Sequence, residues 1–234
     1  KQETSKIFSE IFNLSEKYRV PTFIMTDECV GHMTEKVIIP SADEIELLDR
    51  KWYEGPKEDY LPYKVDESLV PYMIKCGDGY HFHTTGLTHD ERGYPVINAE
   101  CQKTLLRRLI DKIDNNADDI IRMEKDQVEG ADVVVISYGI TSRVAIRGIE
   151  KARQDGIKVG MIRLITVWPF PVNYIKELAK QIKAFVVPEI NCGQIVLEVE
   201  RCVAGQAKTV SVPHCGGWVH NPDDIYNSIK EAVK

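Results

Sequence analysis

Long apolar runs are missing from this chain of 234 residues, whose most apolar run, Val133 to Ile136, has only the length of a β-strand. A membrane-spanning helix needs about 18 consecutive apolar residues, so the sequence predicts no membrane partner. An excess of positive charge is missing too, because 30 Lys and Arg residues stand against 36 Asp and Glu residues, for a net charge of −6. This acidic balance argues against nucleic acid as the main partner.

Metal-binding cysteine motifs are also absent. The six cysteines are scattered, and no two have C-x-x-C spacing: Cys29, Cys76, Cys101, Cys192, Cys202 and Cys215. Zinc or iron–sulfur ligation by this chain alone is therefore not predicted. The sequence has neither a signal peptide nor an initiator methionine. We expect free thiols in a reducing, cytoplasmic setting, and a chain that is a fragment of a longer protein.

Self-contained catalytic and phosphate-binding motifs are the third absence. The chain has no G-x-x-x-x-G-K-S/T loop, no G-x-G-x-x-G turn, no G-x-S-x-G elbow and no H-E-x-x-H pair. Each of these motifs places a complete set of binding or catalytic groups in one local structure. Without them, the residue chemistry predicts a chain that contributes to a site rather than one that carries a whole active site.

Hydrophobic periodicity is what the sequence does contain, and it predicts an α/β fold. From Ala131 onward, continuous apolar runs alternate with amphipathic segments. The predicted strands are 133–136, 157–164, 184–187 and 209–212, and the predicted helices are 142–154, 172–182, 193–202 and 222–233. Buried strands that alternate with helices indicate a parallel sheet covered on both faces, which is a three-layer α/β/α domain.

The first 130 residues are less regular. Residues 4–18 predict an amphipathic helix and residues 22–26 a short buried strand, which together would close an earlier α/β domain. The stretch 40–97 is rich in proline, glycine and tyrosine, which indicates a long irregular connection suited to an interface. A long or broken helix then runs from Asn98 to Gly130. We therefore expect three regions, 1–39, 40–130 and 131–234.

Candidate site residues follow the predicted strands, because open parallel sheets bind ligands at the carboxyl ends of their strands. Gly139, Trp168, Glu189 and Asn191 lie at such ends and are strand-end or interface candidates. Gly139 begins a turn that either offers backbone amides to an anion or is a plain strand–helix turn. Glu189 beside Asn191 is either a carboxylate with a perturbed pKa or a cap of the following helix.

A polar cluster at residues 81–93 has two interpretations. His81, His83 and His89 have side chains that can ligate a metal, and His81 and His83 would share one face of a strand. The other interpretation is a structural polar turn. A catalytic metal site also needs a cleft and hydrogen-bond partners that orient its ligands, which a sequence cannot show, and we predict no metal site.

Five ordered segments resemble the alpha subunit of the 2-oxoacid:ferredoxin oxidoreductases. They are EKYRVPTFIMTDE from Glu16, TGLTHDERGYP from Thr85, ISYG from Ile136, RLITVWPFP from Arg163 and VPEINCGQ from Val187. The 2-oxoglutarate enzymes are the nearest branch, and the enzymes for branched-chain 2-oxoacids such as 3-methyl-2-oxobutanoate come second. A stand-alone α/β interaction or regulatory domain is the alternative from another class, since fold does not fix function.

The resemblance implies a heteromeric enzyme that oxidatively decarboxylates 2-oxoglutarate to succinyl-CoA and passes electrons to ferredoxin. It implies a domain like the transketolase C-terminal domain at 131–234, preceded by the tail of a thiamine pyrimidine-binding domain. A beta subunit would hold thiamine diphosphate and Mg²⁺. Partner chains, such as gamma and a ferredoxin-like delta subunit, would hold the 4Fe–4S clusters. Coenzyme A would be the co-substrate. This chain alone would bind none of them, and the activating glutamate is expected upstream of Lys1.

Since the resemblance assigns the cofactors to other chains, this chain would contribute to the assembly of the complex and to part of a substrate channel. Thr85, His89 and Arg92 are the channel candidates, because they lie in the polar cluster of the long irregular connection. Arg92 would either pair with a substrate carboxylate, which a guanidinium binds bidentately, or tie the loop to Asp90 or Glu91.

Overall fold

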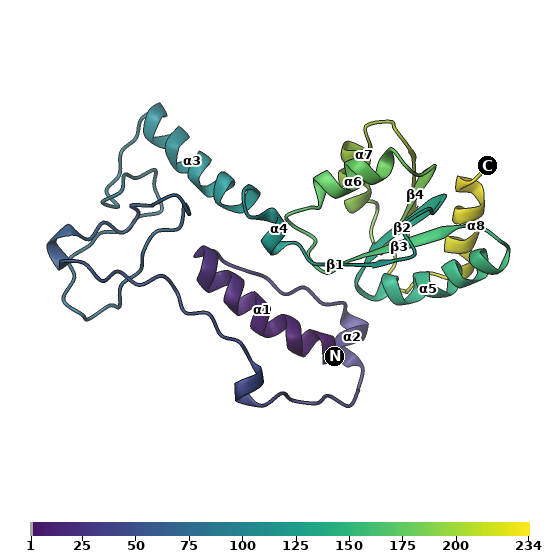
Figure 1. The fold of residues 1–234 in the computed structure, drawn as a ribbon, viewed down its shortest axis with the longest axis horizontal. Coiled ribbons are helices and arrows are strands. Elements are labelled where there is room, and N and C mark those ends of the chain that lie inside the picture. Colours follow the sequence, from purple (N-terminus) through teal and green to yellow (C-terminus); the bar gives the residue numbers. More distant parts are fainter. Residues whose placement is uncertain (1) are drawn as a thin grey trace. The chain divides into compact units, whose positions relative to one another are not determined.

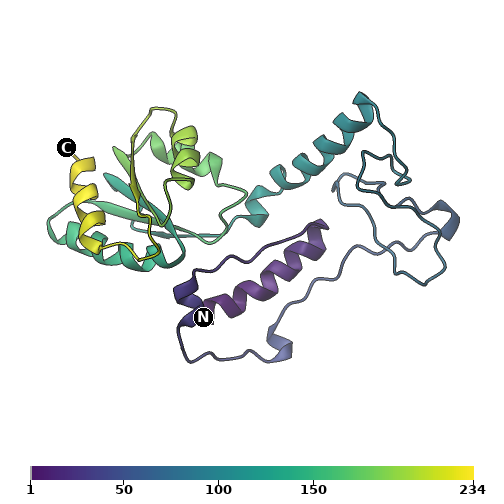
Figure 2. The ribbon, with the colours of Figure 1, turned by 180° about the vertical axis from the view of Figure 1, so that it is seen from behind.

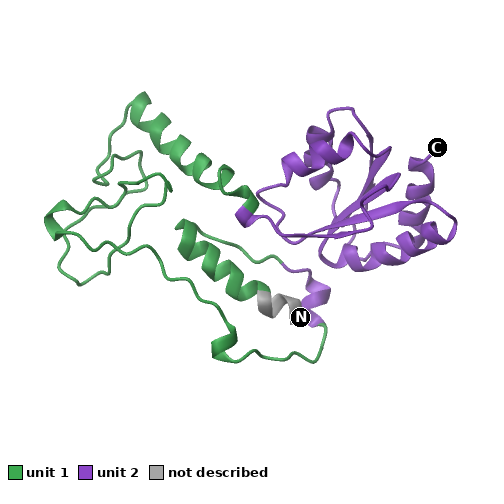
Figure 3. Ribbon diagram, viewed as in Figure 1, with its two compact units in different colours: residues 1–25, 33–118 green, residues 26–32, 119–234 purple. Residues whose placement is uncertain are grey.

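The computed structural model describes residues 2–234, with side chains from Ile7 onward. The chain forms two compact units (Figure 3). Unit 1 contains residues 1–25 and 33–118, and unit 2 contains residues 26–32 and 119–234. Unit 2 therefore takes a short segment from the N-terminal side of unit 1 as well as the whole C-terminal half of the chain.

A five-stranded sheet forms the centre of unit 2 (Figure 1). Its strands are β1 (Met123–Asp126), β2 (Val133–Tyr138), β3 (Val159–Leu164), β4 (Ala184–Glu189) and β5 (Lys208–Pro213). The spatial order is β1-β3-β2-β4-β5, with β1 antiparallel to β3 and every other neighbouring pair parallel. The predicted parallel sheet is confirmed.

Helices cover both faces of this sheet, as Figures 1 and 2 show from opposite sides. On one face lie α5 (Gly139–Gln154) and α8 (Pro222–Ala232), and on the other lie α6 (Val172–Ala179) and α7 (Ile195–Val203). Side chains alternate along each strand, so Val133 and Val135 pack against α5 and α8 while Val134 and Ile136 pack against α6 and α7. All four valine and isoleucine side chains are fully buried. The three-layer α/β/α prediction is therefore confirmed.

The edge strand β1 corrects one prediction. We expected a long or broken helix to continue as far as Gly130. The helix α3 (Ala99–Asp114) does break, and α4 (Ala117–Ile120) follows it, but residues 123–126 then pair with β3 instead of continuing as helix. The segment reads Met-Glu-Lys-Asp and has no apolar alternation, because three of its four side chains are exposed at the sheet edge. Backbone hydrogen bonds to β3 make this segment a strand, and such bonds leave no hydrophobic pattern in the sequence.

Unit 1 is built from two helices and a long irregular segment. The helix α1 (Gln2–Tyr18) matches the predicted amphipathic helix, and Asn98 begins α3 by accepting a hydrogen bond from the Cys101 amide at 2.8 Å. Between them, the described part of unit 1 contains the short 3₁₀ helices η1 (Ala42–Glu44) and η2 (Lys57–Asp59). No helix of the described chain combines the length and the apolar character needed to cross a membrane.

The predicted buried strand at residues 22–26 is wrong. This segment is extended but pairs with no strand in the described part of the chain, and it is followed by the short helix α2 (Glu28–His32). Phe23 and Met25 are 81% and 89% exposed. An apolar run becomes a buried strand only where a neighbouring strand accepts its backbone hydrogen bonds, and the structure offers none here.

Aromatic rings hold the irregular segment together. Tyr60 is buried, and its ring contacts those of Tyr53, Tyr80 and Phe82 with centroids 5.1, 5.4 and 6.2 Å away. The ring of Tyr72 joins the same group through Tyr53 at 6.3 Å. Such tilted and edge-to-face contacts are favourable geometries for aromatic pairs. These rings, which we expected to suit an interface, thus pack around buried Tyr60 within unit 1, while Phe82 stays 37% exposed.

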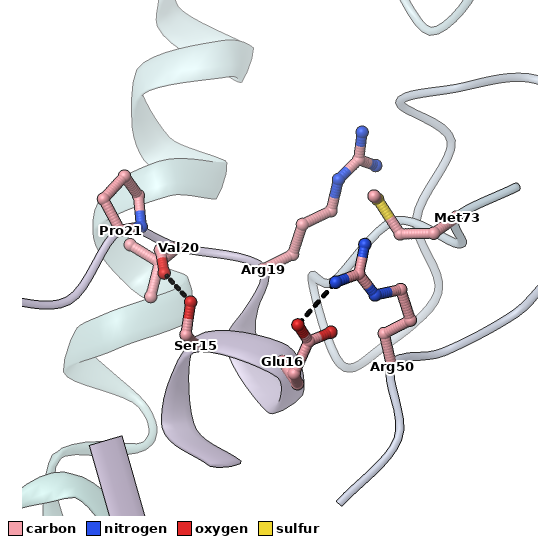
Figure 4. Close-up of a pocket in the computed structure, with 7 residues that line it drawn as sticks. All are labelled: Ser15, Glu16, Arg19, Val20, Pro21, Arg50 and Met73. Carbon is pink, nitrogen blue, oxygen red and sulfur yellow. Dashed lines mark hydrogen bonds and ion pairs between the residues drawn. The ribbon is translucent and has the colours of Figure 1, made fainter. Parts of the chain in front are cut away.

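A pocket of about 280 Å³ opens beside the C-terminal end of α1 (Figure 4). Its lining consists of Ser15, Glu16, Arg19, Val20, Pro21, Arg50 and Met73. Arg50 reaches across it to form an ion pair with Glu16 at 2.5 Å. Arg19 donates to the carbonyl oxygens of Pro62 and Tyr72 at 2.8 and 3.4 Å. The charged groups of this pocket therefore join α1 to the irregular segment.

Candidate functional site

A buried carboxylate lies at the carboxyl end of β4. Glu189 is only 1% exposed, and its two oxygens accept hydrogen bonds from the first residues of α7 and from two side chains. The donors are the backbone amides of Gln194 (3.2 Å), Ile195 (2.9 Å) and Val196 (2.9 Å), the Tyr138 hydroxyl (2.9 Å) and Asn191 Nδ2 (3.1 Å). A negative charge at this end of a helix also meets the positive pole of the helix dipole. Of the two interpretations of Glu189, the geometry fits the helix cap.

Asn191 and Tyr138 complete this network. Asn191 Nδ2 also donates to the Tyr138 hydroxyl at 3.0 Å, while Asn191 Oδ1 accepts from the Gly193 amide at 2.7 Å. Burial, with the Glu189 carboxylate beside it, raises the pKa of Tyr138, so the phenol keeps its proton at neutral pH and remains a donor. The network therefore fastens the ends of the neighbouring strands β2 and β4 to each other and to α7.

A second carboxylate occupies the start of α5. The Asp27 carboxylate accepts a hydrogen bond from the Ile140 amide at 2.7 Å. Gly139 has a φ of +58°, and a Cβ at this position would lie 2.4 Å from Asp27 Oδ2. Glycine is thus required here both for the left-handed backbone and for the close approach of the carboxylate. The anion that we considered for this turn is supplied by the chain itself.

Two cysteine sulfurs meet at the same edge of the sheet. Cys192 follows β4 and Cys215 follows β5, and their Sγ atoms lie 3.0 Å apart, within hydrogen-bonding distance. Both side chains are exposed. Trp168, in the turn after β3, is 72% exposed and projects from the surface. The structure thus places the predicted strand-end residues at one edge and adds a thiol pair to them.

Two of the channel candidates of unit 1, His89 and Arg92, lie in a compact turn closed by a bridge between His89 and Pro95, and Thr85 precedes this turn. Arg92 forms an ion pair with Asp90, with Nη2 and Nε at 2.6 and 2.8 Å from Oδ2. The hydrogen bond and charge of Arg92 hold the pKa of Asp90 below its usual range. The hydroxyl of Thr85 accepts from the Leu87 amide at 3.2 Å. Arg92 and Asp90 thus form the intraloop pair that we considered as one alternative.

The histidines of this segment pack against tyrosines. His83 stacks on Tyr94 with centroids 4.6 Å apart, and its Nδ1 lies 2.7 Å from the Gly93 carbonyl oxygen. The His89 ring lies 3.9 Å from that of Tyr63. Residues 81–83 form no strand, so the expected shared face of His81 and His83 is wrong. Within the described residues, no three His, Cys, Asp or Glu side chains are grouped so as to hold a metal ion.

Lys112 is expected to make the stability of unit 1 depend on pH. It is 3% exposed, and burial, followed by the charges of Arg108 and Arg19, lowers its pKa from 10.5 to about 8. Between these values the unfolded chain holds the proton and the folded chain does not, so stability rises with pH. We expect a gain of about 2 kcal/mol between pH 7.5 and 10 that is lost in Lys112→Met.

Hydrogen exchange at the two pH values reports the free energy of unfolding of unit 1 and so measures this gain. Lys103→Met is the matched control, because Lys103 is exposed on the same helix. An equal slope in the Lys112 variant and the parent chain would contradict the assignment.

Sequence reasoning missed three of these groups. Asp27 lies 113 residues from its partner Ile140, and no local pattern connects them. Tyr138 is not among the candidates from the sequence. In the sequence, Cys192 and Cys215 are two of six scattered cysteines, although both follow the ends of predicted strands. That shared position was the one available signal, and it required the order of the strands in the sheet.

Two family models match the chain in sequence order. The model described as "Pyruvate flavodoxin/ferredoxin oxidoreductase, thiamine diP-bdg" matches residues 1–107. The model described as "Pyruvate:ferredoxin oxidoreductase core domain II" matches residues 131–225. Together they include Asp27, the channel candidates of unit 1, and the sheet-edge residues from Tyr138 to Cys215.

Individual proteins agree with these models. 2-Oxoglutarate synthase subunit KorA of Methanothermobacter marburgensis is 43% identical over 229 residues, which cover 97% of this chain and 60% of that protein. Ketoisovalerate oxidoreductase subunit VorB of Methanothermobacter thermautotrophicus is 29% identical over 232 residues, covering 99% of this chain and 58% of that protein. This chain thus spans about 60% of the length of the curated relatives it matches.

A solved structure is similar as well. The 2-oxoglutarate:ferredoxin oxidoreductase from Magnetococcus marinus with 2-oxoglutarate, coenzyme A and succinyl-CoA bound matches with a TM-score of 0.82 at 27% identity. The match covers 95% of this chain and 39% of that chain. The resemblance that the sequence motifs predicted is confirmed, and this chain belongs to the 2-oxoacid:ferredoxin oxidoreductase family.

Proposed function

We propose that this chain is the C-terminal portion of the alpha subunit of a 2-oxoglutarate:ferredoxin oxidoreductase. The observation that carries the proposal is the similarity to a 2-oxoglutarate synthase subunit over nearly the whole chain. The similar solved structure binds 2-oxoglutarate, coenzyme A and succinyl-CoA. The relative named for ketoisovalerate is less similar, which favours 2-oxoglutarate over a branched-chain 2-oxoacid as the substrate.

In the proposed reaction, 2-oxoglutarate loses carbon dioxide, its acyl group passes to coenzyme A, and two electrons reduce ferredoxin. Thiamine diphosphate, when bound to the assembled enzyme, would stabilise the carbanion left by decarboxylation. Mg²⁺ and 4Fe–4S clusters complete the proposed cofactor set. The proposed partners are a beta subunit that holds thiamine diphosphate, gamma and delta subunits where present, and ferredoxin.

The sheet edge of unit 2 does not fit the diphosphate of this cofactor. A diphosphate is commonly bound by free backbone amides at a helix N-terminus. At this edge the first amides of α7 donate to Glu189 and the Ile140 amide of α5 donates to Asp27. Both helix starts therefore carry carboxylates of the chain itself, which would repel a further anion. This geometry supports the proposal that a partner subunit holds the cofactor.

The contribution that we propose for unit 1 is part of the substrate channel, at Thr85, His89 and Arg92. Of these three, Arg92 has the largest expected effect on substrate binding, because its side chain is 65% exposed while it also pairs with Asp90. A guanidinium can bind the second carboxylate of 2-oxoglutarate in addition to this partner. In the full complex, Arg92→Ala is expected to raise KM for 2-oxoglutarate about tenfold and to leave kcat nearly unchanged.

Asp90→Asn distinguishes the two roles of Arg92. This variant weakens the ion pair within the loop but keeps the guanidinium available to substrate. If Arg92 binds substrate, steady-state kinetics will show the rise in KM for Arg92→Ala and not for Asp90→Asn. Equal effects in the two variants would assign Arg92 to loop structure, and an unchanged KM in both would remove it from the channel.

The whole proposal is tested with the full-length subunit, purified anaerobically together with the chains that accompany it. We expect bound thiamine diphosphate in the preparation and ferredoxin reduction that requires both 2-oxoglutarate and coenzyme A. 3-Methyl-2-oxobutanoate and pyruvate serve as competing substrates in the same assay. Faster turnover of 3-methyl-2-oxobutanoate would replace the proposed substrate by the branched-chain one. A lone chain without cofactor would favour the interaction-domain alternative.

A further inference from the structure

The thiols of Cys192 and Cys215 are held together by the topology of the sheet. The strands β4 and β5 are parallel neighbours, with Glu189 opposite Pro213, and the His214 amide extends their ladder by donating to the Glu189 carbonyl oxygen at 2.9 Å. Each cysteine follows within three residues of this register position. The two loops therefore leave the sheet side by side, and the Sγ atoms lie 3.0 Å apart.

This separation is close to that of bonded sulfurs. A disulfide has an S–S distance of about 2.05 Å, so about 1 Å of movement is needed. Glycines beside both cysteines can absorb it, because Gly193 has φ +96° and Gly216 has φ +117°. A Cβ at Gly216 would have no atom within 4 Å, which shows open space around that loop. Both thiols are also exposed and so accessible to a small reagent.

We propose that Cys192 and Cys215 form a redox-active dithiol, which a hydroperoxide oxidises to an intramolecular disulfide. One thiolate attacks a peroxide oxygen, the O–O bond breaks, and a sulfenic acid and one hydroxide or alkoxide result. The second sulfur then attacks the sulfenic sulfur, the S–S bond forms, and water leaves. Two thiols lose two electrons in total, and the peroxide gains them to become two waters, or one water and one alcohol.

The other four cysteines do not share this geometry. No second pair of cysteine sulfurs in the described residues lies within hydrogen-bonding distance. Cys202 is fully buried in the core of unit 2, and the thiol of Cys101 donates to the His89 carbonyl oxygen at 3.2 Å. Cys29 and Cys76 are exposed single thiols. A sulfenic acid at either of those two positions would have no second thiol within hydrogen-bonding distance to form a disulfide. It would be oxidised further to the sulfinic or sulfonic acid.

The contact does not distinguish the two thiols by geometry. The hydrogen bond to Cys192 raises the pKa of Cys215, but either sulfur can be the donor, so in the proposed reaction either thiol can act as the resolving one. The disulfide would join the loop that carries Asn191 to the loop between β5 and α8.

The test uses the full-length subunit in its purified complex, reduced and handled anaerobically. The complex is exposed briefly to hydrogen peroxide, alkylated with iodoacetamide and digested with trypsin without reductant. Cleavage after Lys183, Arg201 and Lys208 separates Cys192, Cys202 and Cys215 into three different peptides. Mass spectrometry then identifies any linked pair directly.

We expect a linked pair of the Cys192 and Cys215 peptides, two hydrogens lighter than their sum and restored by dithiothreitol. Alkylation of both cysteines should fall at least tenfold, and together. Cys215→Ser should convert Cys192 to sulfinic or sulfonic acid, whereas the matched control Cys76→Ser should leave the linked pair unchanged. Persisting alkylation of both cysteines, linkage to any other cysteine, or direct formation of sulfonic acid in the parent complex would overturn the proposal.

Discussion

Glu189→Ala is expected to destabilise unit 2 by about 4 kcal/mol, the largest effect of any single substitution that we predict. The carboxylate is buried and accepts from the Gln194 amide just before α7, from the first two amides of α7, and from Tyr138 and Asn191. Its removal leaves the three backbone amides without this acceptor, and each buried donor that loses its partner costs about 1 to 3 kcal/mol. Loss of the helix cap adds to this cost.

Hydrogen exchange at the amides of Gln194, Ile195 and Val196 reports this loss most directly. About 4 kcal/mol corresponds to an increase in their exchange rate of about a thousandfold. Glu198→Ala is the matched control, because Glu198 lies on the same helix, is half-buried, and forms a surface ion pair with Arg201. We expect a change below about 0.5 kcal/mol for this variant. Equal protection of the α7 amides in both variants would show that Glu189 is not the cap.

Gly93→Ala is expected to cost unit 1 about 3 kcal/mol or more. Gly93 has φ +83°, and a Cβ would lie 1.9 Å from the carbonyl oxygen of His83, which is a backbone atom and cannot swing aside. The left-handed conformation alone costs an L-residue about 1 to 2 kcal/mol. Relief of the overlap would move the backbone of Gly93 away from that of His83 and break the contact between His83 Nδ1 and the Gly93 carbonyl oxygen.

Two further glycines separate these two contributions. Gly77 has φ +98° but open space around its Cβ position, so Gly77→Ala should show only the backbone cost of about 1 kcal/mol. Gly86 has neither a left-handed φ nor a neighbour within 4 Å, so Gly86→Ala should change stability by less than about 0.5 kcal/mol. Exchange of the Val96 amide, which donates to the Thr88 carbonyl oxygen, measures the opening of the turn. A Gly93 variant as protected as the Gly86 variant would contradict the overlap.

The part of the fold that the sequence predicted best is the part in which burial leaves a pattern. The run Val133 to Ile136 is buried on both sides of the sheet, so four consecutive apolar residues could only be an interior strand. The edge strand β1 has no such run, and it was missed. Residues 22–26 have the composition of an interior strand but no pairing partner within the described chain, so composition alone misled.

The candidate site was predictable to a similar extent. Gly139, Glu189 and Asn191 could be placed at one sheet edge, because the carboxyl ends of parallel strands share an edge. Whether Glu189 is a cap or a reactive carboxylate depends on where its oxygens point, which no sequence pattern specifies. The contacts of Asp27 and of Cys192 with Cys215 depend on tertiary structure in the same way. The sequence motifs were sufficient to predict the family, whereas the individual contacts could be identified only from the structure.

The cap that Asp27 places on α5 also affects how the chain is made. Asp27 and Ile140 are separated by 113 residues, and a ribosome adds about 5 to 20 residues per second. The aspartate therefore leaves the ribosome about 6 to 23 s before the amide that it binds. During that interval all of residues 33–118 are synthesised, and unit 1 can fold while the short segment 26–32 is still unpaired. Unit 2 is thus completed by a segment that was synthesised before most of unit 1, and an expression clone that starts at residue 119 would lack it.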